Sequence, residues 1–204
     1  MITIIDYNAG NLGSVDKAFK YVGEEVKIAQ SAQDILAAEA LVLPGVGAFG
    51  DAVNKLKECN MHWAIKDYIA KGRPFLGVCL GLQMLFEHSE ETPDVKGLGI
   101  FEGEIKLFPG DMGLKIPQMG WNGIKTNPRS RLFKGIVLGE HVYFVHSYYL
   151  TAADDSIVAA KCDYGIEFHA AIENNNVFAT QFHPEKSGMT GLKILKNFIS
   201  VYKE

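Results

Sequence analysis

Cysteine is scarce in this sequence, and its few thiols show neither the spacing of a metal site nor that of a disulfide framework. The 204 residues include three cysteines, Cys59, Cys79 and Cys162, an odd number with no Cys-x-x-Cys pair. Such usage is typical of a reducing compartment, so we expect a cytoplasmic protein. A His-Glu-x-x-His motif is also missing, and we expect neither a metal nor another cofactor. The open question is whether one thiol is a nucleophile.

Long hydrophobic runs and an excess of basic residues are missing too. No apolar run approaches the roughly 20 residues of a membrane-spanning helix, and the opening stretch lacks the basic lead of a signal peptide. The 20 Lys and Arg residues are outnumbered by 24 Asp and Glu, which gives a net charge of −4. We therefore expect neither a membrane nor a nucleic acid as partner. No linker or repeat divides the chain, and we expect one domain over residues 1–204.

Short apolar runs alternate with helical patterns in the first half of the chain, whereas the second half is rich in strands. The patterns predict strands at 2–6, 25–29, 41–43 and 75–78, with helices at 12–22, 51–71 and 80–88. They then predict strands at 100–108, 123–126, 142–150, 157–164, 167–173 and 177–182, and an amphipathic helix at 189–202. Strand–helix alternation with short turns indicates an α/β domain, a mixed and mostly parallel sheet flanked by helices.

Cys79 lies in Gly77-Val78-Cys79-Leu80-Gly81, where a predicted strand meets a predicted helix without a loop. Such a sharp turn strains its central residue and needs small neighbours, as in the Gly-x-Ser-x-Gly elbow of serine hydrolases. It lifts the side chain above the carboxyl edge of the sheet and places it at a helix N-terminus, which favours the thiolate. We predict that Cys79 is a nucleophile, and that Cys59 and Cys162 are apolar packing.

A thiol nucleophile needs a base and a group that orients the base, and His183-Pro184-Glu185 offers both. Pro184 biases His183 toward extended backbone, in which residues i and i+2 point the same way. Glu185 can therefore reach one imidazole nitrogen while the other faces Cys79. An exposed histidine beside an unrelated glutamate is the alternative that His-x-Glu alone leaves open.

The segment 45–50 matches Gly-x-Gly-x-x-Gly after a strand, so a dinucleotide site has to be weighed. The acidic residue expected about 20 positions later is missing, because the residues around Ala70 have a helical pattern. We favour a pliable loop at Gly45-Val46-Gly47 whose N–H groups, with that of Leu80, form an oxyanion hole.

These motifs resemble those of the class I glutamine amidotransferases. The elbow continues into Leu82-Gln83, and His183-Pro184-Glu185 follows Gln181-Phe182. The resemblance covers essentially the whole chain. Further motifs, at 44–47, 119–122, 144–148 and 185–188, are similar to those of the branch that forms the amidotransferase subunits of imidazole glycerol phosphate synthases.

The resemblance implies a flavodoxin-like α/β fold and hydrolysis of glutamine to glutamate and ammonia by a Cys-His-Glu triad. It implies a heterodimer with a (β/α)₈-barrel cyclase in histidine biosynthesis, which receives the ammonia through a channel. The residues that it implies for glutamine binding are Gly45, Gly47, Gln83, Ser147 and Tyr148. Those that it implies for the cyclase interface are Asn11, Met119, Trp121, Tyr143 and Lys186.

Two alternatives stay open at this point. One is an amidotransferase subunit that supplies ammonia to another synthase, for example one that makes a surface amino sugar. The other is a non-catalytic α/β binding module, against which the complete set of Cys79, His183 and Glu185 argues. For Met119 and Trp121, core packing is a further alternative to an interface.

Overall fold

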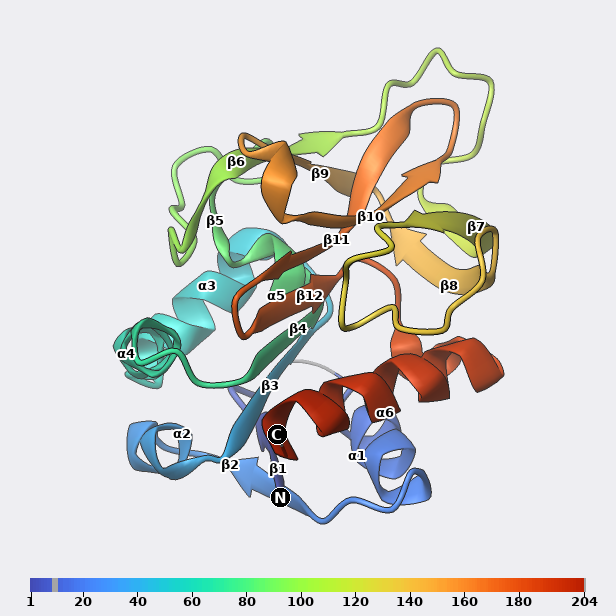
Figure 1. Cartoon of the computed structure of the whole chain (residues 1–204). Coiled ribbons are helices and arrows are strands. Elements are labelled where there is room, and N and C mark those ends of the chain that lie inside the picture. The colour runs from blue at the N-terminus through green and yellow to red at the C-terminus, as the bar shows by residue number, and fades with distance from the viewer. Residues whose placement is uncertain (9–10, 204) are drawn as a thin grey trace.

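A mixed β-sheet runs through the computed structural model, which describes residues 1–8 and 11–203 (Figure 1). The strands of its main path follow the order β2-β1-β3-β4-β12-β11-β10-β7-β8. Their bounds are β1 Ile2–Ile5, β2 Val26–Ala29, β3 Ala40–Gly45, β4 Phe75–Cys79, β7 Gln118–Thr126, β8 His141–His146, β10 Val158–Asp163, β11 Glu167–Asn174 and β12 Val177–Thr180. Off this path lie β5 Phe86–Ser89, β6 Phe101–Leu107 and β9 Tyr148–Ala152. The predicted α/β class with a mixed sheet flanked by helices is confirmed.

The parallel part of the sheet brings the carboxyl ends of three strands to one edge. β3, β4 and β12 are parallel neighbours, with Gly45 opposite Cys79 and Thr180 opposite Val78. The segments that follow these three strands therefore meet above the same edge. This is the position at which open α/β sheets bind ligands.

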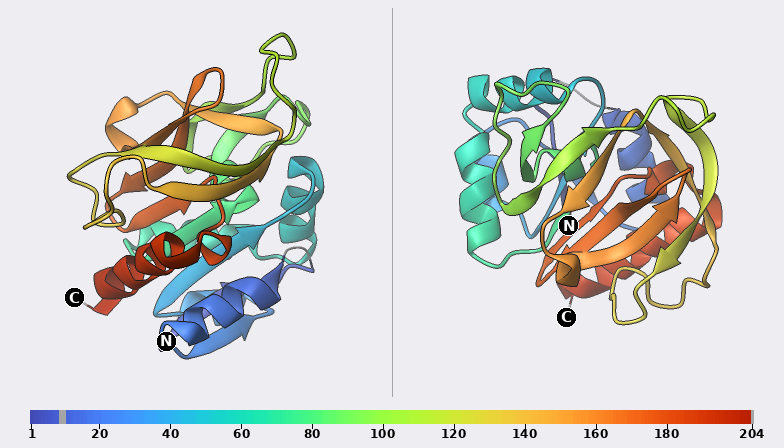
Figure 2. Two further views of the ribbon diagram at one scale, coloured as in Figure 1. Left: turned by 90° about the vertical axis from the view of Figure 1, so that its right-hand side faces the viewer. Right: turned by 90° about the horizontal axis from the view of Figure 1, so that it is seen from above.

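Helices cover both faces of this parallel part. Their bounds are α1 Leu12–Tyr21, α2 Ala32–Ala37, α3 Phe49–Glu58, α4 His62–Ala70, α5 Leu80–Gln83 and α6 Gly188–Lys203. α1 and α6 pack on one face, and α2, α3 and α4 on the other (Figures 1 and 2). The second half of the chain extends the sheet beyond β12 with antiparallel strands, which Figure 2 shows from two further sides.

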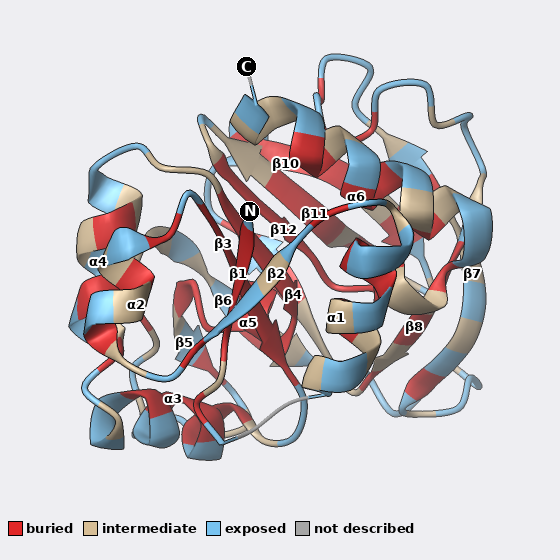
Figure 3. Cartoon of the chain, turned by 90° about the horizontal axis from the view of Figure 1, so that it is seen from below, coloured by how far each residue is buried: buried red, intermediate tan, exposed pale blue. Residues whose placement is uncertain are grey.

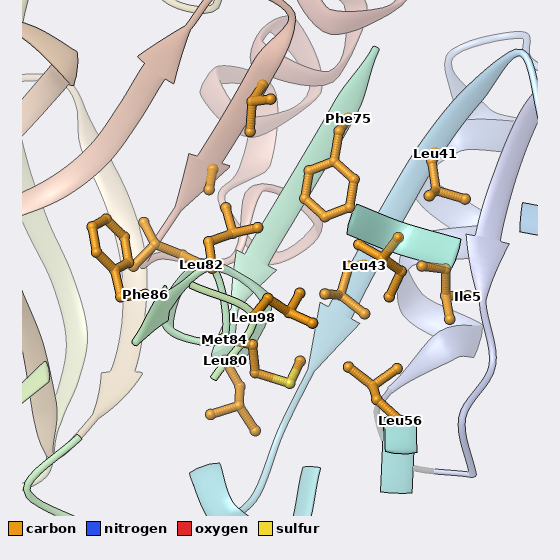
Figure 4. Packing of buried hydrophobic residues seen from close by; sticks show 14 of the residues in the cluster. Ile5, Leu41, Leu43, Leu56, Phe75, Leu80, Leu82, Met84, Phe86 and Leu98 are labelled. Atoms are coloured by element: carbon orange, nitrogen blue, oxygen red, sulfur yellow. The ribbon is translucent and has the colours of Figure 1, made fainter. Parts of the chain in front are cut away.

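Side chains of the central strands alternate between two hydrophobic clusters, one on each face of the sheet. Leu41, Leu43 and Phe75 face the α2–α4 side, where Leu80 and Leu82 join them (Figure 4), whereas other side chains of these strands face α1 and α6. The strands β1, β3, β4 and β12 are buried on both faces, whereas α1, α3 and α6 each bury only one side (Figure 3). None of the helices in the described part of the chain is long and apolar enough to cross a membrane.

The predicted helix at 51–71 is wrong in one respect, because it is two helices. α3 ends in a Schellman motif, in which Asn60 has a φ of 53° and Met61 N donates to Leu56 O at 2.9 Å. Asparagine tolerates this left-handed conformation, which stops α3 before α4 begins at His62. The helix α2 was not predicted.

The predicted helix at 80–88 is also wrong beyond Gln83. Residues Phe86–Ser89 form β5, which pairs in parallel with β6, and Phe86 is fully buried. Pairing with a strand whose residues lie 15 or 16 positions further along the chain overrides the local helical pattern. The predicted strand at 142–150 is two strands, because the chain switches partners at Ser147: β8 pairs with β7, and β9 pairs with β6.

Candidate active site

Cys79 occupies a strained turn between β4 and α5, as the glycine pattern predicts. Its φ and ψ are 55° and −108°, a conformation that non-glycine residues rarely adopt. A Cβ on Gly81 would lie 1.9 Å from the carbonyl oxygen of Leu43, and one on Gly77 would lie 2.8 Å from the carbonyl oxygen of Gly81. Both flanking glycines are therefore required for the turn to close. α5 has only four residues, so its dipole contributes less than the predicted helix would.

The segment after β12 places His183 and Glu185 beside this turn. His183 has extended backbone, with φ and ψ of −98° and 100°, and its N–H donates to the carbonyl oxygen of Tyr143 at 3.0 Å. The Nδ1 atom of His183 lies 2.8 Å from Oε1 of Glu185, and each side chain is 3% exposed. The carboxylate can only accept, so Nδ1 carries the proton of this bond and Nε2 is left for Cys79.

Electrostatics favour a charged imidazole. Burial alone lowers the pKa of His183, but hydrogen bonds to Cys79 and Glu185, together with the negative charges of both, raise it to about 10. Burial raises the pKa of the Cys162 thiol to about 12, and this sulfur does not line the cavity described below. A thiol that is hard to ionise is a poor nucleophile, which agrees with the prediction that Cys162 is packing.

Cys79 and His183 line one wall of a cavity of about 360 Å³. Of the predicted glutamine-site residues, six line the same cavity, namely Val46, Gly47, Leu80, Gln83, Ser147 and Tyr148. Gly45 does not line it. Gly45 is needed for a close approach instead, since a Cβ there would lie 2.8 Å from Cβ of Leu80.

Three residues that sequence reasoning did not single out contribute to this site. Glu91 and His146 line the cavity, and the buried Tyr7 donates its hydroxyl to the carbonyl oxygen of Pro44 at 3.1 Å, under the glycine loop. Tyr7 directly follows a predicted strand, His146 lies within the motif 144–148, and Glu91 lies in an acidic pair. None of these patterns indicates a role for the individual residue, because only the fold brings the three to the edge of the sheet.

Glu91 also argues against a dinucleotide at Gly45–Gly50. Its Oε2 accepts from the N–H of Phe49 at 2.7 Å, at the beginning of α3. A carboxylate therefore occupies the helix end where a pyrophosphate would bind. In the part of the chain that the structure describes, no three His, Cys, Asp or Glu side chains gather as a metal site would require.

Of the residues predicted for a partner interface, Lys186 lines the cavity, and Met119 is the strand partner of Val145, which also lines it. Met119 is 65% and Trp121 54% exposed, which excludes core packing for both. The rings of Trp121 and Tyr143 meet edge to face at 5.9 Å between centroids, and Nζ of Lys186 lies 5.9 Å from the centroid of Tyr143. We call Met119, Trp121, Tyr143 and Lys186 the rim cluster. Asn11 is exposed at the beginning of α1, and α1 contacts the segment Pro184–Lys186, which includes Lys186 of the rim cluster.

Comparison with known proteins places this geometry in context. The sequence profile described as "Glutamine amidotransferase class-I" matches residues 3–201. The chain is 52% identical to "Imidazole glycerol phosphate synthase subunit HisH" of Caldanaerobacter subterraneus subsp. tengcongensis, with 100% of this chain and 99% of that protein covered. It is 50% identical to the protein of the same name from Aquifex aeolicus, with 96% and 94% covered.

Solved structures show the same fold at much lower identity. A crystal structure titled as a glutamine amidotransferase superposes with a TM-score of 0.79 at 16% identity, with 100% of both chains covered. The structure of PurLQS from Thermotoga maritima superposes with a TM-score of 0.75 at 19% identity, with 98% of this chain and 97% of that chain covered.

Proposed function

This chain belongs to the class I glutamine amidotransferases, and we propose that Cys79, His183 and Glu185 are its catalytic triad. It is the glutaminase subunit of an imidazole glycerol phosphate synthase. The observation that carries the proposed triad is the 2.8 Å contact between His183 and Glu185, which leaves Nε2 for Cys79 in the same cavity.

The reaction begins with attack of the Cys79 thiolate on the side-chain amide carbon of glutamine. Backbone N–H groups of Leu80 and of the Val46–Gly47 loop hold the oxyanion that forms. The tetrahedral intermediate collapses, the C–N bond breaks, and protonated His183 supplies the proton with which ammonia leaves. A γ-glutamyl thioester on Cys79 remains. Neutral His183 then takes a proton from water, whose hydroxide displaces the thiol and releases glutamate.

Selection of glutamine rests on the charge and shape of the cavity. We assign Glu91 to the α-ammonium group of glutamine, because it is an acidic side chain in the lining. Gln83, Ser147 and Tyr148 contribute the remaining wall. The volume of about 360 Å³ is adequate for one amino acid.

The rim cluster supports a partner that takes the ammonia directly. Ammonia released into neutral water becomes ammonium, which is no nucleophile, so direct transfer is needed. Exposed Trp and Met side chains beside a catalytic cavity are typical of a protein interface. We propose a heterodimer in which the rim cluster and Asn11 contact a (β/α)₈-barrel cyclase. An amidotransferase for another synthase has the same triad and would differ in this partner.

The three unpaired thiols support a cytoplasmic location.

Ammonia release by Cys79→Ala tests the triad. In the presence of the purified cyclase subunit and its substrate, we expect wild-type protein to release ammonia from glutamine, and Cys79→Ala to release none. Cys59→Ala is the matched control, since it removes a half-buried thiol away from the cavity. Intact mass measured during turnover should show a glutamyl adduct on wild type and on Cys59→Ala. Undiminished ammonia release by Cys79→Ala would contradict the mechanism.

A further inference from the structure

A buried amide donates a hydrogen bond to the sulfur of Cys79. Nε2 of Gln181 donates to Sγ of Cys79 at 3.7 Å, and Gln181 is fully buried. Gln181 and His183 lie two residues apart in the segment that follows β12. The strand β12 itself is hydrogen-bonded to β4, the strand that ends at Cys79. The pairing of these two strands therefore holds the Gln181 amide against the sulfur of Cys79 and places His183 in the same cavity.

The orientation of the Gln181 amide is fixed by a chain of hydrogen bonds. Nε2 of Gln83 donates to the carbonyl oxygen of Tyr148 and to Oε1 of Gln181, both at 3.1 Å. A backbone carbonyl only accepts, so the Gln83 atom that faces it must be the amide nitrogen. The Gln181 atom that faces this nitrogen must then be the carbonyl oxygen, and the NH₂ group of Gln181 must face Cys79.

A histidine holds the first acceptor of this chain in place. Nδ1 of the buried His146 donates to the same carbonyl oxygen of Tyr148, at 2.7 Å. Burial, followed by the nearby charge of His183, lowers the pKa of His146 to about 4 even though the hydrogen bond to Tyr148 opposes the shift. His146 is therefore neutral at pH 7, and the series of hydrogen bonds from Cys79 through Gln181, Gln83 and Tyr148 ends on an uncharged donor.

We propose that Gln181 holds the Cys79 thiolate through this N–H···S hydrogen bond, and that Gln83 is a positioning residue that keeps the Gln181 amide turned toward the sulfur. The inference rests on the proposed function, in which Cys79 is the nucleophile. A hydrogen bond to a charged group is about twice as strong as one between neutral groups, and burial strengthens it further. An amide N–H does not titrate, so this donor stays with the sulfur whether His183 is protonated or neutral.

The pH dependence of alkylation separates this role from a purely structural one. Iodoacetamide is attacked by the thiolate, with formation of the S–C bond and loss of iodide, and mass spectrometry of the Cys79 peptide gives the rate. Gln181→Met keeps the length of the side chain and removes the donor. We expect it to alkylate Cys79 about tenfold more slowly than wild type at pH 7. The two rates should converge near pH 10, where the sulfur needs no donor in order to ionise.

Gln118→Met is the matched control. Gln118 is also fully buried, its amide donates to Oδ1 of Asn122 at 2.9 Å, and it lies near enough to the other buried thiol, Cys162, to oppose the rise that burial causes in the pKa of that thiol. We expect this variant to retain the wild-type alkylation profile at Cys79. If Gln181→Met keeps the wild-type rate at pH 7, or is slowed equally at every pH, the proposal is wrong.

A second variant keeps the test decisive if Gln181→Met fails to fold. Gln83→Met leaves Gln181 in place but removes the donor that orients it, so a slower rate at pH 7 that recovers near pH 10 is expected again. An unchanged profile in a folded Gln83→Met protein overturns its positioning role. Cys79→Ala is measured in parallel: if that variant still released ammonia, the triad itself would fail, whereas an inactive Cys79→Ala with an unchanged Gln181→Met profile would reject only the role of Gln181.

Discussion

The imidazole of His183 and the carboxylate of Glu185 are joined by a 2.8 Å hydrogen bond, with both side chains almost fully removed from solvent. The two residues are separated only by Pro184, which keeps His183 extended. A two-residue spacing in extended chain thus both orients the imidazole of His183 and helps to raise its pKa.

Glu185→Gln is expected to lower kcat for glutamine hydrolysis about a hundredfold. The amide of the variant can still accept a hydrogen bond but carries no negative charge. The pKa of His183 is therefore raised less in the variant than in wild type. His183 loses the proton that leaving ammonia needs as the pH rises through its pKa. The alkaline fall of kcat/KM should therefore begin at lower pH in the variant than in wild type.

Asp155→Asn is the control for this measurement. Asp155 also pairs with a histidine, at 3.3 Å from Nε2 of His169, but it is exposed and outside the cavity. The kcat and the pH profile of the Asp155→Asn variant should match those of wild type. An unchanged alkaline limb in Glu185→Gln would argue against Glu185 as the partner of the base.

Acid should weaken the fold through His146. Burial lowers the pKa of His146 in the folded protein to about 4, whereas its pKa in the unfolded chain is about 6.5. Between these two pH values the unfolded chain binds a proton at His146 and the folded protein does not. Stability attributable to this group is complete above pH 6.5 and is lost as the pH falls from 6.5 toward 4. At pH 5 the cost is about 2 kcal/mol relative to pH 7.5.

Urea unfolding of wild type and His146→Phe at the two pH values measures this cost. Phe108, Phe144 and Phe168 surround His146, so a phenyl ring is a compatible substitute. The free energy of unfolding of wild type should fall by about 2 kcal/mol more than that of the variant. Equal losses in both proteins would show that His146 is not the group that titrates.

Glu91→Gln should raise KM for glutamine about tenfold, with a smaller change in kcat. The amide oxygen can still accept from the N–H of Phe49, so the beginning of α3 is preserved while the charge that attracts the α-ammonium group is lost. Glu90→Gln is the matched control, because Glu90 accepts from the N–H of Leu107 and does not line the cavity. A KM that does not change in Glu91→Gln would rule out its contact with substrate.

Gly81→Ala should destabilise the protein by about 3 kcal/mol, measured as the free energy of unfolding in urea. The added methyl would lie 1.9 Å from the carbonyl oxygen of Leu43, a backbone atom of the central sheet that cannot move aside. Gly13→Ala provides the comparison, since a Cβ at this position in α1 meets nothing within 4 Å. It should leave stability unchanged or raise it by about 0.5–1 kcal/mol. Equal stabilities of the two variants would contradict the close approach at the turn.

Trp121→Ala should weaken binding to the cyclase subunit about thirtyfold, measured as Kd by titration calorimetry. Exposed tryptophans at an interface commonly contribute about 2 kcal/mol. The other tryptophan, Trp63 on α4, is 46% exposed and supplies the control, Trp63→Ala, which should bind like wild type. Comparable Kd values for both variants would place the interface elsewhere.

Local patterns predicted the parts of this protein whose physics is local. The glycines around Cys79 indicated a turn that only small neighbours permit, and Pro184 between His183 and Glu185 indicated extended backbone. Most strands were recognisable from their apolar runs. The helix predicted at 80–88 failed because Phe86 is buried by pairing with β6, a contact that lies outside any local window.

The sequence by itself determined the sharp turn at Cys79 and the pairing of His183 with Glu185, since both depend on residues within two positions of each other. Only the tertiary structure decided which side chains share the cavity with them. Glu91 and His146 reach the site because β4, β12 and the strands beside them align at one edge, and no spacing along the chain encodes that alignment. Strand pairing sums many weak contacts over distant segments, whereas a turn is fixed by the sterics of a few adjacent residues.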